Sequence, residues 1–321
     1  RGQNIQYNKE DYVVVLLGDS QVESGSSKFE QIPEKILERL LNDQYHLPVK
    51  VFSVGTSGYG QDQQLLALTE YFHKYRADIV ILWETRSNDI WNNTFRNHWP
   101  KKTGAAKPTY WLKKDQLTGP TEKIGEEINY SKLNLLKLLK QAMNPPIHLE
   151  EKWNDFLPQP YKPLNNYSGK WNDTWQKLYD DKLLYLHGDD FLEEKSHLSI
   201  YFTPLSERMR YSRELTKKLL EEIKNKCSKH GSKFVSFEAI REVSAIPEED
   251  AVYRLNNVYY RASKKQAEES INYINQNHLH LKILVTVTPW ETKIGSDHLN
   301  TMANYQVLKD LTTELANMLQ R

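Results

Sequence analysis

The 321-residue sequence has little of several things, and each shortage excludes a class of protein. Its single cysteine, Cys227, cannot form an internal disulfide and lies in a helix-like run, as an inert thiol would. No apolar run approaches the roughly 18 residues that a membrane-spanning helix needs. With 43 Lys+Arg against 42 Asp+Glu, the chain has neither a basic excess nor an acidic tail. We therefore expect a globular protein with no nucleic-acid partner.

Several motifs of nucleotide binding and catalysis are also missing. The sequence has no Gly-Lys-Ser/Thr phosphate loop and no Gly-x-Gly-x-x-Gly that opens a helix after a strand. The Gly-x-Ser-x-Gly elbow of another hydrolase class is absent as well. His278 and His280 form the one close histidine pair, and no partner cysteine or suitably spaced acid accompanies them. The sequence therefore predicts no cofactor and no metal.

What the chain does have is an alternation of strand-like and helix-like segments before residue 95 and after residue 205. Apolar runs indicate buried strands, and apolar residues at helical spacing indicate helices. Such alternation implies βαβ units, a parallel sheet and helices on both of its faces. The expected strands are 12–18, 49–54, 77–83, 233–238 and 281–287, and the expected helices are 31–43, 61–76, 207–229, 262–276 and one starting near Asn300. The predicted fold class is α/β, a three-layer α/β/α sandwich with a large insertion.

The insertion is residues 96–205, where the alternation stops. This segment is rich in Pro, Asn, Lys and Tyr and holds five of the eight tryptophans, Trp99, Trp111, Trp153, Trp171 and Trp175. Aromatic rings stack on sugar faces, although a single Trp more often packs in a core. We expect residues 10–95 and 206–321 to form the catalytic core, and the insertion to shape the substrate cleft.

Four loops carry the candidate chemistry. Gly18-Asp19-Ser20, Gly55–Gly60 and Glu84–Asp89 each follow an expected strand, and Asp297-His298 lies between the last strand and the last helix. Singly, each loop is ordinary material for a turn or a helix cap. Together they lie at one edge of the sheet, where ligands bind in α/β folds. A serine beside a histidine and oxyanion donors is the minimum equipment for acyl transfer.

These segments resemble the blocks of the SGNH, or GDSL, hydrolases. Gly18-Asp19-Ser20 with Gly25 is similar to the first block, Gly58 to the second, Asn88-Asp89 to the third and His298 to the last. The resemblance covers about residues 10–95 and 205–321 and implies a flavodoxin-like fold. It also implies Ser20 as nucleophile and His298 as general base, with an oxyanion hole formed by the Ser20 and Gly58 N–H groups and the Asn88 side chain.

Two positions depart from the family pattern. The acid, Asp297, stands immediately before His298 rather than two or three residues before it. Either Asp297 completes a catalytic triad or the site is a Ser–His dyad. Arg86 stands where the family often has glycine. It either contacts an anionic substrate or, as we favour, forms a salt bridge with Glu84.

The predicted function is hydrolysis of O-acyl esters, in particular O-acetyl esters, through an acyl-serine intermediate. The expected substrate is an acylated carbohydrate or a small ester. Two alternatives stay open: a polysaccharide or glycan O-acetyltransferase that uses the same site, and a non-catalytic glycan-binding domain that retains the fold. The chain begins at Arg1 without Met, as processed chains do. This leaves open a signal, a membrane partner or an anchor upstream, and favours an extracytoplasmic location.

Overall fold

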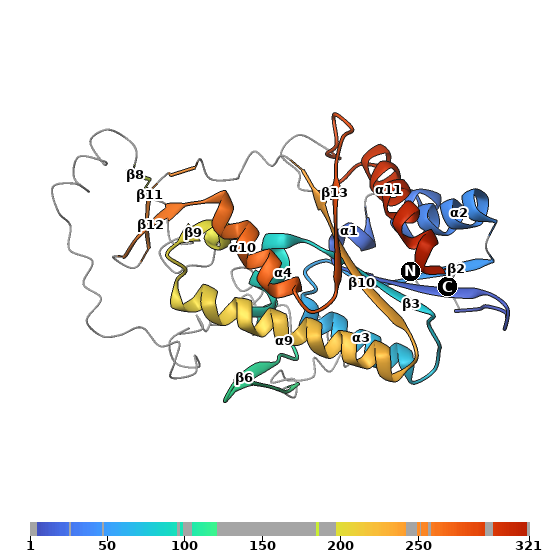
Figure 1. Ribbon diagram of the computed structural model, residues 1–321, viewed down its shortest axis with the longest axis horizontal. Helices are drawn as coiled ribbons and strands as arrows, with labels where there is room; N and C mark the ends of the chain where they lie inside the picture. The colour runs from blue at the N-terminus through green and yellow to red at the C-terminus, as the bar shows by residue number, and fades with distance from the viewer. Residues whose placement is uncertain are drawn as a thin grey trace, which may run out of the picture.

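A parallel five-stranded sheet forms the centre of the computed structural model (Figure 1). The structure describes residues 5–25, 27–46, 48–94, 97–98, 105–120, 184–185, 197–241, 249–250, 252–255, 258–292 and 298–319. The strand order is β2-β1-β3-β10-β13. The strands are β1 (Tyr12–Gly18), β2 (Val49–Gly55), β3 (Ile79–Glu84), β10 (Lys233–Ile240) and β13 (Leu279–Leu284). The order reverses direction between β1 and β3, and this switch point is where α/β folds bind ligands.

Helices cover both faces of the sheet, as the strand–helix alternation predicts (Figure 1). One face carries α2 (Pro33–Tyr45) and α11 (Thr301–Leu319), and the other carries α3 (Gln61–Phe72), α4 (Arg86–Thr94), α9 (Glu207–Lys229) and α10 (Lys264–Asn275). Successive strand residues point to opposite faces, so Leu16 packs under α2 and Leu17 under α3 and α9. The three-layer α/β/α class is confirmed.

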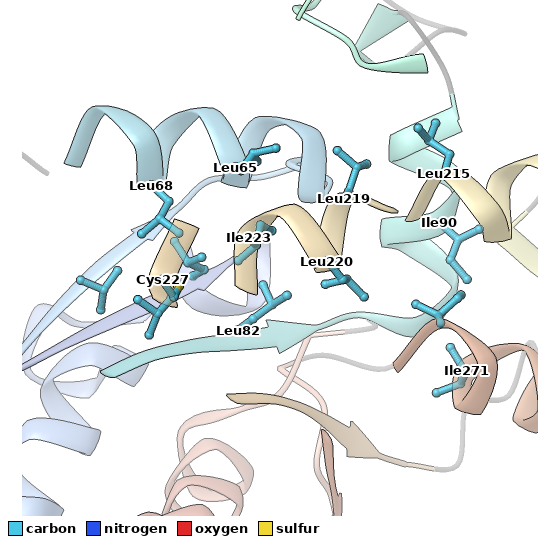
Figure 2. Packing of buried hydrophobic residues seen from close by; sticks show 14 of the residues in the cluster. Leu65, Leu68, Leu82, Ile90, Leu215, Leu219, Leu220, Ile223, Cys227 and Ile271 are labelled. Carbon is cyan, nitrogen blue, oxygen red and sulfur yellow. The ribbon is translucent and has the colours of Figure 1, made fainter. Parts of the chain in front are cut away.

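The core on the α9 face is built from the middle of that long helix. Leu219 and Ile223 of α9 share one buried cluster with Leu65 and Leu68 of α3, and Leu220 lies between α9 and the β3 strand (Figure 2). Cys227 is fully buried in the same cluster, and burial raises the pKa of its thiol to about 12. A buried, protonated thiol agrees with the inert role expected for this cysteine.

Smaller elements complete the described structure. A second sheet has the order β8-β11-β12-β9, with strands β8 (Leu184–Tyr185), β9 (Phe202–Thr203), β11 (Val252–Leu255) and β12 (Val258–Ala262). Two short antiparallel pairs are also present: β4 (Asn97–His98) pairs with β5 (Ala105–Ala106), and β6 (Trp111–Lys113) pairs with β7 (Gln116–Thr118). The short helices are α1 (Ser20–Glu23), η1 (Phe29–Gln31) and η3 (His197–Tyr201). None of the described helices is long and apolar enough to cross a membrane.

Most of residues 96–205 lie outside the described residues, including Trp99, Trp153, Trp171 and Trp175. The described pieces of this segment pack on the α9 face of the core, since Leu112, Ile200 and Tyr201 belong to the same buried cluster as Leu219. The division into a core and a cleft-shaping insertion stays a prediction.

Most expected elements are found, with one shifted strand and several short antiparallel pairs that were not predicted. The expected strand at 281–287 is β13, which begins at Leu279 and ends at Leu284. It lies at the edge of the sheet, and its first residues are polar or half exposed, so their apolar signal is weak. The hairpin β11–β12 was not predicted. It pairs in the second sheet, outside the βαβ pattern from which the other strands were inferred.

Candidate active site

The first strand ends in a tightly packed turn. Gly18 lies opposite Gly55 in the register of β1 and β2. A Cβ atom at Gly18 would lie 2.3 Å from Val22 Cγ2, and one at Gly55 would lie 2.6 Å from the Gly18 carbonyl oxygen. Both glycines are therefore required for space, because α1 folds back directly onto the ends of the two strands. This packing places Ser20, the first residue of α1, at the carboxyl edge of the sheet.

Ser20 and His298 are brought into contact. Ser20 Oγ lies 2.8 Å from His298 Nε2, although the two residues are 278 positions apart. Both side chains are half-buried. A neutral imidazole with its proton on Nδ1 would accept the serine hydrogen at Nε2, which is the direction that a general base requires.

The segment that follows His298 is held in place by backbone contacts. The Thr292 N–H donates to the His298 carbonyl oxygen at 3.0 Å, and the Leu299 N–H donates to Gln21 Oε1 at 3.3 Å. Asn300 then caps α11, since its Oδ1 accepts from the Ala303 N–H at 3.0 Å. The expected start of this helix near Asn300 is thus confirmed, and the cap fixes the loop on the side of α11.

Asp297, the candidate third member of a triad, lies outside the described residues. A catalytic triad and a Ser–His dyad therefore both stay predictions from the sequence. The preceding Ser296 also lies outside the described residues.

The candidate oxyanion donors come from the turn between β2 and α3 and from the first turn of α4, which follows β3. Gly58 is buried and has a φ of 76°, a left-handed conformation that favours glycine at this position. The Asn88 amide donates one hydrogen bond to Asp19 Oδ2 at 2.6 Å. An amide nitrogen carries two hydrogens, so this contact orients Asn88 and leaves it a second donor. The role of Gly58 and Asn88 as oxyanion donors remains a proposal.

Asp19 is the residue that links these parts. It caps α1 by accepting from the Gln21 N–H at 2.9 Å, and its second oxygen holds Asn88. It is buried, and burial raises the pKa of its carboxyl even though hydrogen bonds with Gln21, Asn88 and Thr85 act in the opposite direction. Asp19 therefore positions both the start of α1, where Ser20 lies, and the Asn88 amide.

A second buried acid, Asp89, lies behind Asp19 and belongs to a network that the sequence did not predict. Asp89 Oδ2 accepts from the Thr85 N–H and from Gln61 Nε2, each at 2.8 Å. Gln61 Oε1 in turn accepts from Asn93 Nδ2. Burial, followed by the charge of Asp19, raises the pKa of Asp89 well above its usual range. Gln61 belongs to α3, whereas Thr85 and Asn93 each lie four residues from Asp89, so only the contacts with Gln61 depend on packing between elements.

The prediction that Arg86 forms a salt bridge with Glu84 is wrong, although Arg86 does form a salt bridge. The Arg86 guanidinium donates to both oxygens of Glu238, at 2.9 and 2.8 Å, and also pairs with Glu268. Glu84 instead faces His278 and His280. Glu238 stands opposite Glu84 in the register of β10 and β3, so an acid from another strand takes the place of the one nearby in sequence.

No protein-family model matches the sequence, and no match was found among curated proteins. The chain is similar in structure to the psychrotrophic esterase EstA from Pseudoalteromonas sp., with 9% identity, a TM-score of 0.43, and 96% of this chain and 99% of that chain covered. It is also similar to TesA, with 10% identity, a TM-score of 0.42, and 94% and 97% covered.

A third similar structure is an acetyl xylan esterase, Est2A, from the rumen bacterium Butyrivibrio proteoclasticus. It shares 10% identity with this chain, has a TM-score of 0.38, and the similarity covers 99% of this chain and 66% of that one.

Proposed function

We propose that the protein is a serine-dependent ester hydrolase that removes O-acyl groups, in particular O-acetyl groups, from a carbohydrate. The observation that carries the proposal is the 2.8 Å contact between Ser20 Oγ and His298 Nε2 at the carboxyl edge of the sheet. Serine and histidine in this contact, beside candidate oxyanion donors, are the equipment of acyl transfer. The carbohydrate part of the proposal depends on the aromatic composition of residues 96–205.

The reaction would run in two halves. Ser20 Oγ attacks the ester carbonyl carbon while His298 accepts the hydroxyl proton, and the tetrahedral oxyanion is held by the Ser20 and Gly58 N–H groups and the Asn88 amide. His298 then returns the proton to the leaving alcohol, which leaves an acyl-serine. Water attacks the acyl-serine while His298 accepts a proton from it, and His298 then returns that proton to Ser20 Oγ as the acyl bond breaks, which releases the acid and free Ser20.

The test is hydrolysis of p-nitrophenyl acetate and of acetylated oligosaccharides by the wild-type protein and variants. We expect S20A and H298A each to lower kcat by ~10³-fold or more, since either change removes the nucleophile–base pair. S27A is the matched control, because Ser27 lies in the loop after α1, where its Oγ pairs with Ser24 Oγ at 2.8 Å, and it should retain activity. D297N separates a triad from a dyad: a loss comparable to H298A supports a triad.

Other outcomes of the same assay would overturn the proposal. Release of p-nitrophenol that does not depend on Ser20 would favour a non-catalytic glycan-binding domain. Acetyl transfer to an added oligosaccharide that outpaces hydrolysis would favour an O-acetyltransferase, since both reactions share the first half-reaction.

A further inference from the structure

A cluster of buried polar side chains lies on the α10 face of the sheet, apart from Ser20 and His298. Glu84 ends β3, His280 lies on β13, and His278 lies in the connection between α10 and β13. Their side chains are only 6%, 7% and 2% exposed. In the part of the chain that the structure describes, these three form the one group of metal-ligating side chains whose donor atoms all lie within 4.8 Å of one another.

The distances within this cluster are too long for hydrogen bonds. His280 Nδ1 lies 3.4 Å and His278 Nε2 lies 3.9 Å from Glu84 Oε1. Ligands bound to Zn²⁺ at about 2.0–2.2 Å with tetrahedral angles lie about 3.3–3.6 Å apart. The observed spacing is therefore closer to that of atoms sharing a cation. Glu84 Oε1 is buried and has no hydrogen-bond partner among the described residues, so one of its lone pairs is free to bind an ion.

The surroundings of these ligands have the arrangement that supports metal sites. Ligating histidines usually direct their second ring nitrogen to a carboxylate. His280 Nε2 faces Glu238 Oε1 at 3.6 Å, which is ion-pair distance and not a hydrogen bond, and Glu238 is fixed by two hydrogen bonds from Arg86. Ser236 Oγ lies at hydrogen-bond distance, 2.8 Å, from both His278 Nε2 and His280 Nδ1, so a bound ion would replace these hydrogen bonds at the two ring nitrogens.

The charges in the cluster also call for a cation. Glu238 is neutralised by Arg86, whereas Glu84 forms no ion pair with Lys or Arg in the described part of the chain. The groups that face Glu84 Oε1 are instead the two histidines of the cluster. A buried carboxylate without a Lys or Arg partner favours a bound cation at this position.

We propose that Glu84, His278 and His280 bind a divalent transition-metal ion of the Zn²⁺ type. Two imidazole nitrogens and one carboxylate oxygen are ligands that suit this ion. The depth of the site indicates a structural role: the ion would join the end of β3 to the connection between α10 and β13. The sequence could not predict the site, because its acid comes from β3, about 200 residues before the histidines.

The experiment loads the whole protein during refolding, so that burial does not block entry of the ion. The chain is refolded with Zn²⁺ or Co²⁺, passed through a desalting column, and its metal content is measured by mass spectrometry. We expect about one retained ion per chain, and intense visible absorption from four-coordinate Co²⁺. H278Q, H280Q and E84Q should lose the retained ion. H73Q is the matched control, since His73 is an exposed residue outside the cluster, and it should keep the ion.

The wild-type protein decides the question if a ligand variant does not fold. A melting temperature that rises with Zn²⁺ and falls with a chelator supports the site. Wild-type protein that retains no more metal than a refolded H278Q, or that shows no Co²⁺ absorption, overturns it, and the cation in the cluster is then a proton on an imidazole. The inference is independent of the proposed ester chemistry, because S20A should bind the ion as the wild type does.

Discussion

At the scale of single residues, Asp19 and Asp89 fix the backbone and side chains around Ser20 and Asn88. Asp19 fixes the start of α1 and holds the Asn88 amide, while Asp89 ties the Thr85 N–H to Gln61. Both carboxyls are buried, and burial raises the pKa of each. The site therefore contains two acids whose ionised forms disfavour each other, so the folded protein binds protons there more tightly than the unfolded chain does.

The first prediction concerns Asp89→Asn. Because the folded-state pKa of Asp89 is raised, its contribution to stability is complete below the unfolded pKa of about 4 and is lost as pH rises through the folded value. D89N does not titrate, so its free energy of unfolding should gain on the wild type by ~1 kcal/mol or more between pH 4 and pH 8. Urea unfolding at both pH values, followed by circular dichroism, measures this difference.

D89A is the matched control for this experiment. It leaves the Thr85 N–H and Gln61 Nε2 without their acceptor, so it should be ~1–3 kcal/mol less stable than D89N at both pH values. A D89N protein that loses stability relative to the wild type as pH rises would contradict the raised pKa.

At the scale of elements, the start of α11 holds the candidate base in place. Asn300 caps the helix through Oδ1, and its Nδ2 donates to the carbonyl oxygens of Pro289 and Glu291, across the loop that carries His298. One side chain thus joins the helix to both sides of this loop.

The second prediction separates these two roles of Asn300. N300A should lower the free energy of unfolding by ~1 kcal/mol, because it removes the helix cap. N300D keeps an oxygen for the Ala303 N–H but cannot donate to Pro289 and Glu291. We therefore expect N300D to lose less stability than N300A and yet to lower kcat toward p-nitrophenyl acetate, with KM changed little. If N300D has wild-type kcat, the loop contacts do not position His298.

How far the sequence predicted these elements depends on burial. The wholly apolar run of β1 and the long amphipathic stripe of α9 were predicted with their observed bounds, because both pack against the core along their length. The predicted bounds of β13 were displaced, since an edge strand with half-exposed polar residues lacks a continuous apolar pattern. The contact of Ser20 with His298 could be predicted from the sequence, because both residues follow strands of one sheet. The partners of Arg86, Asp89 and Glu84 could not be predicted, because they include side chains that only the packed layers bring together.

At the scale of the whole molecule, a buried ion pair joins the described part of residues 96–205 to the core. Lys107 Nζ lies 2.6 Å from Asp62 Oδ2 and also donates to the Asn92 carbonyl oxygen, and both charged side chains are almost completely buried. Burial raises the pKa of Asp62 although Lys107 acts against it. The attachment of this segment to α3 therefore depends on a pair of charges that must be present together.

The third prediction follows from that pairing. K107A leaves Asp62 as an uncompensated buried charge, and should cost ~3–5 kcal/mol. The double variant D62N/K107M should recover most of the loss, since removing both charges is far less costly than removing one. The midpoint of urea unfolding measures both effects, and K113A, at an exposed lysine, is the control. Equal losses in the single and double variants would show that the pair is not coupled.

The distance along the chain between Ser20 and His298 has a consequence for biosynthesis. A ribosome that has just added Ser20 must add 278 more residues before the imidazole exists. During that time β1, β2 and β3 can already lie side by side, because they follow one another closely in the chain. Every nascent chain therefore carries Ser20 without its imidazole partner, and the contact on which the proposed ester chemistry depends forms only after translation has passed His298 and α11 has docked.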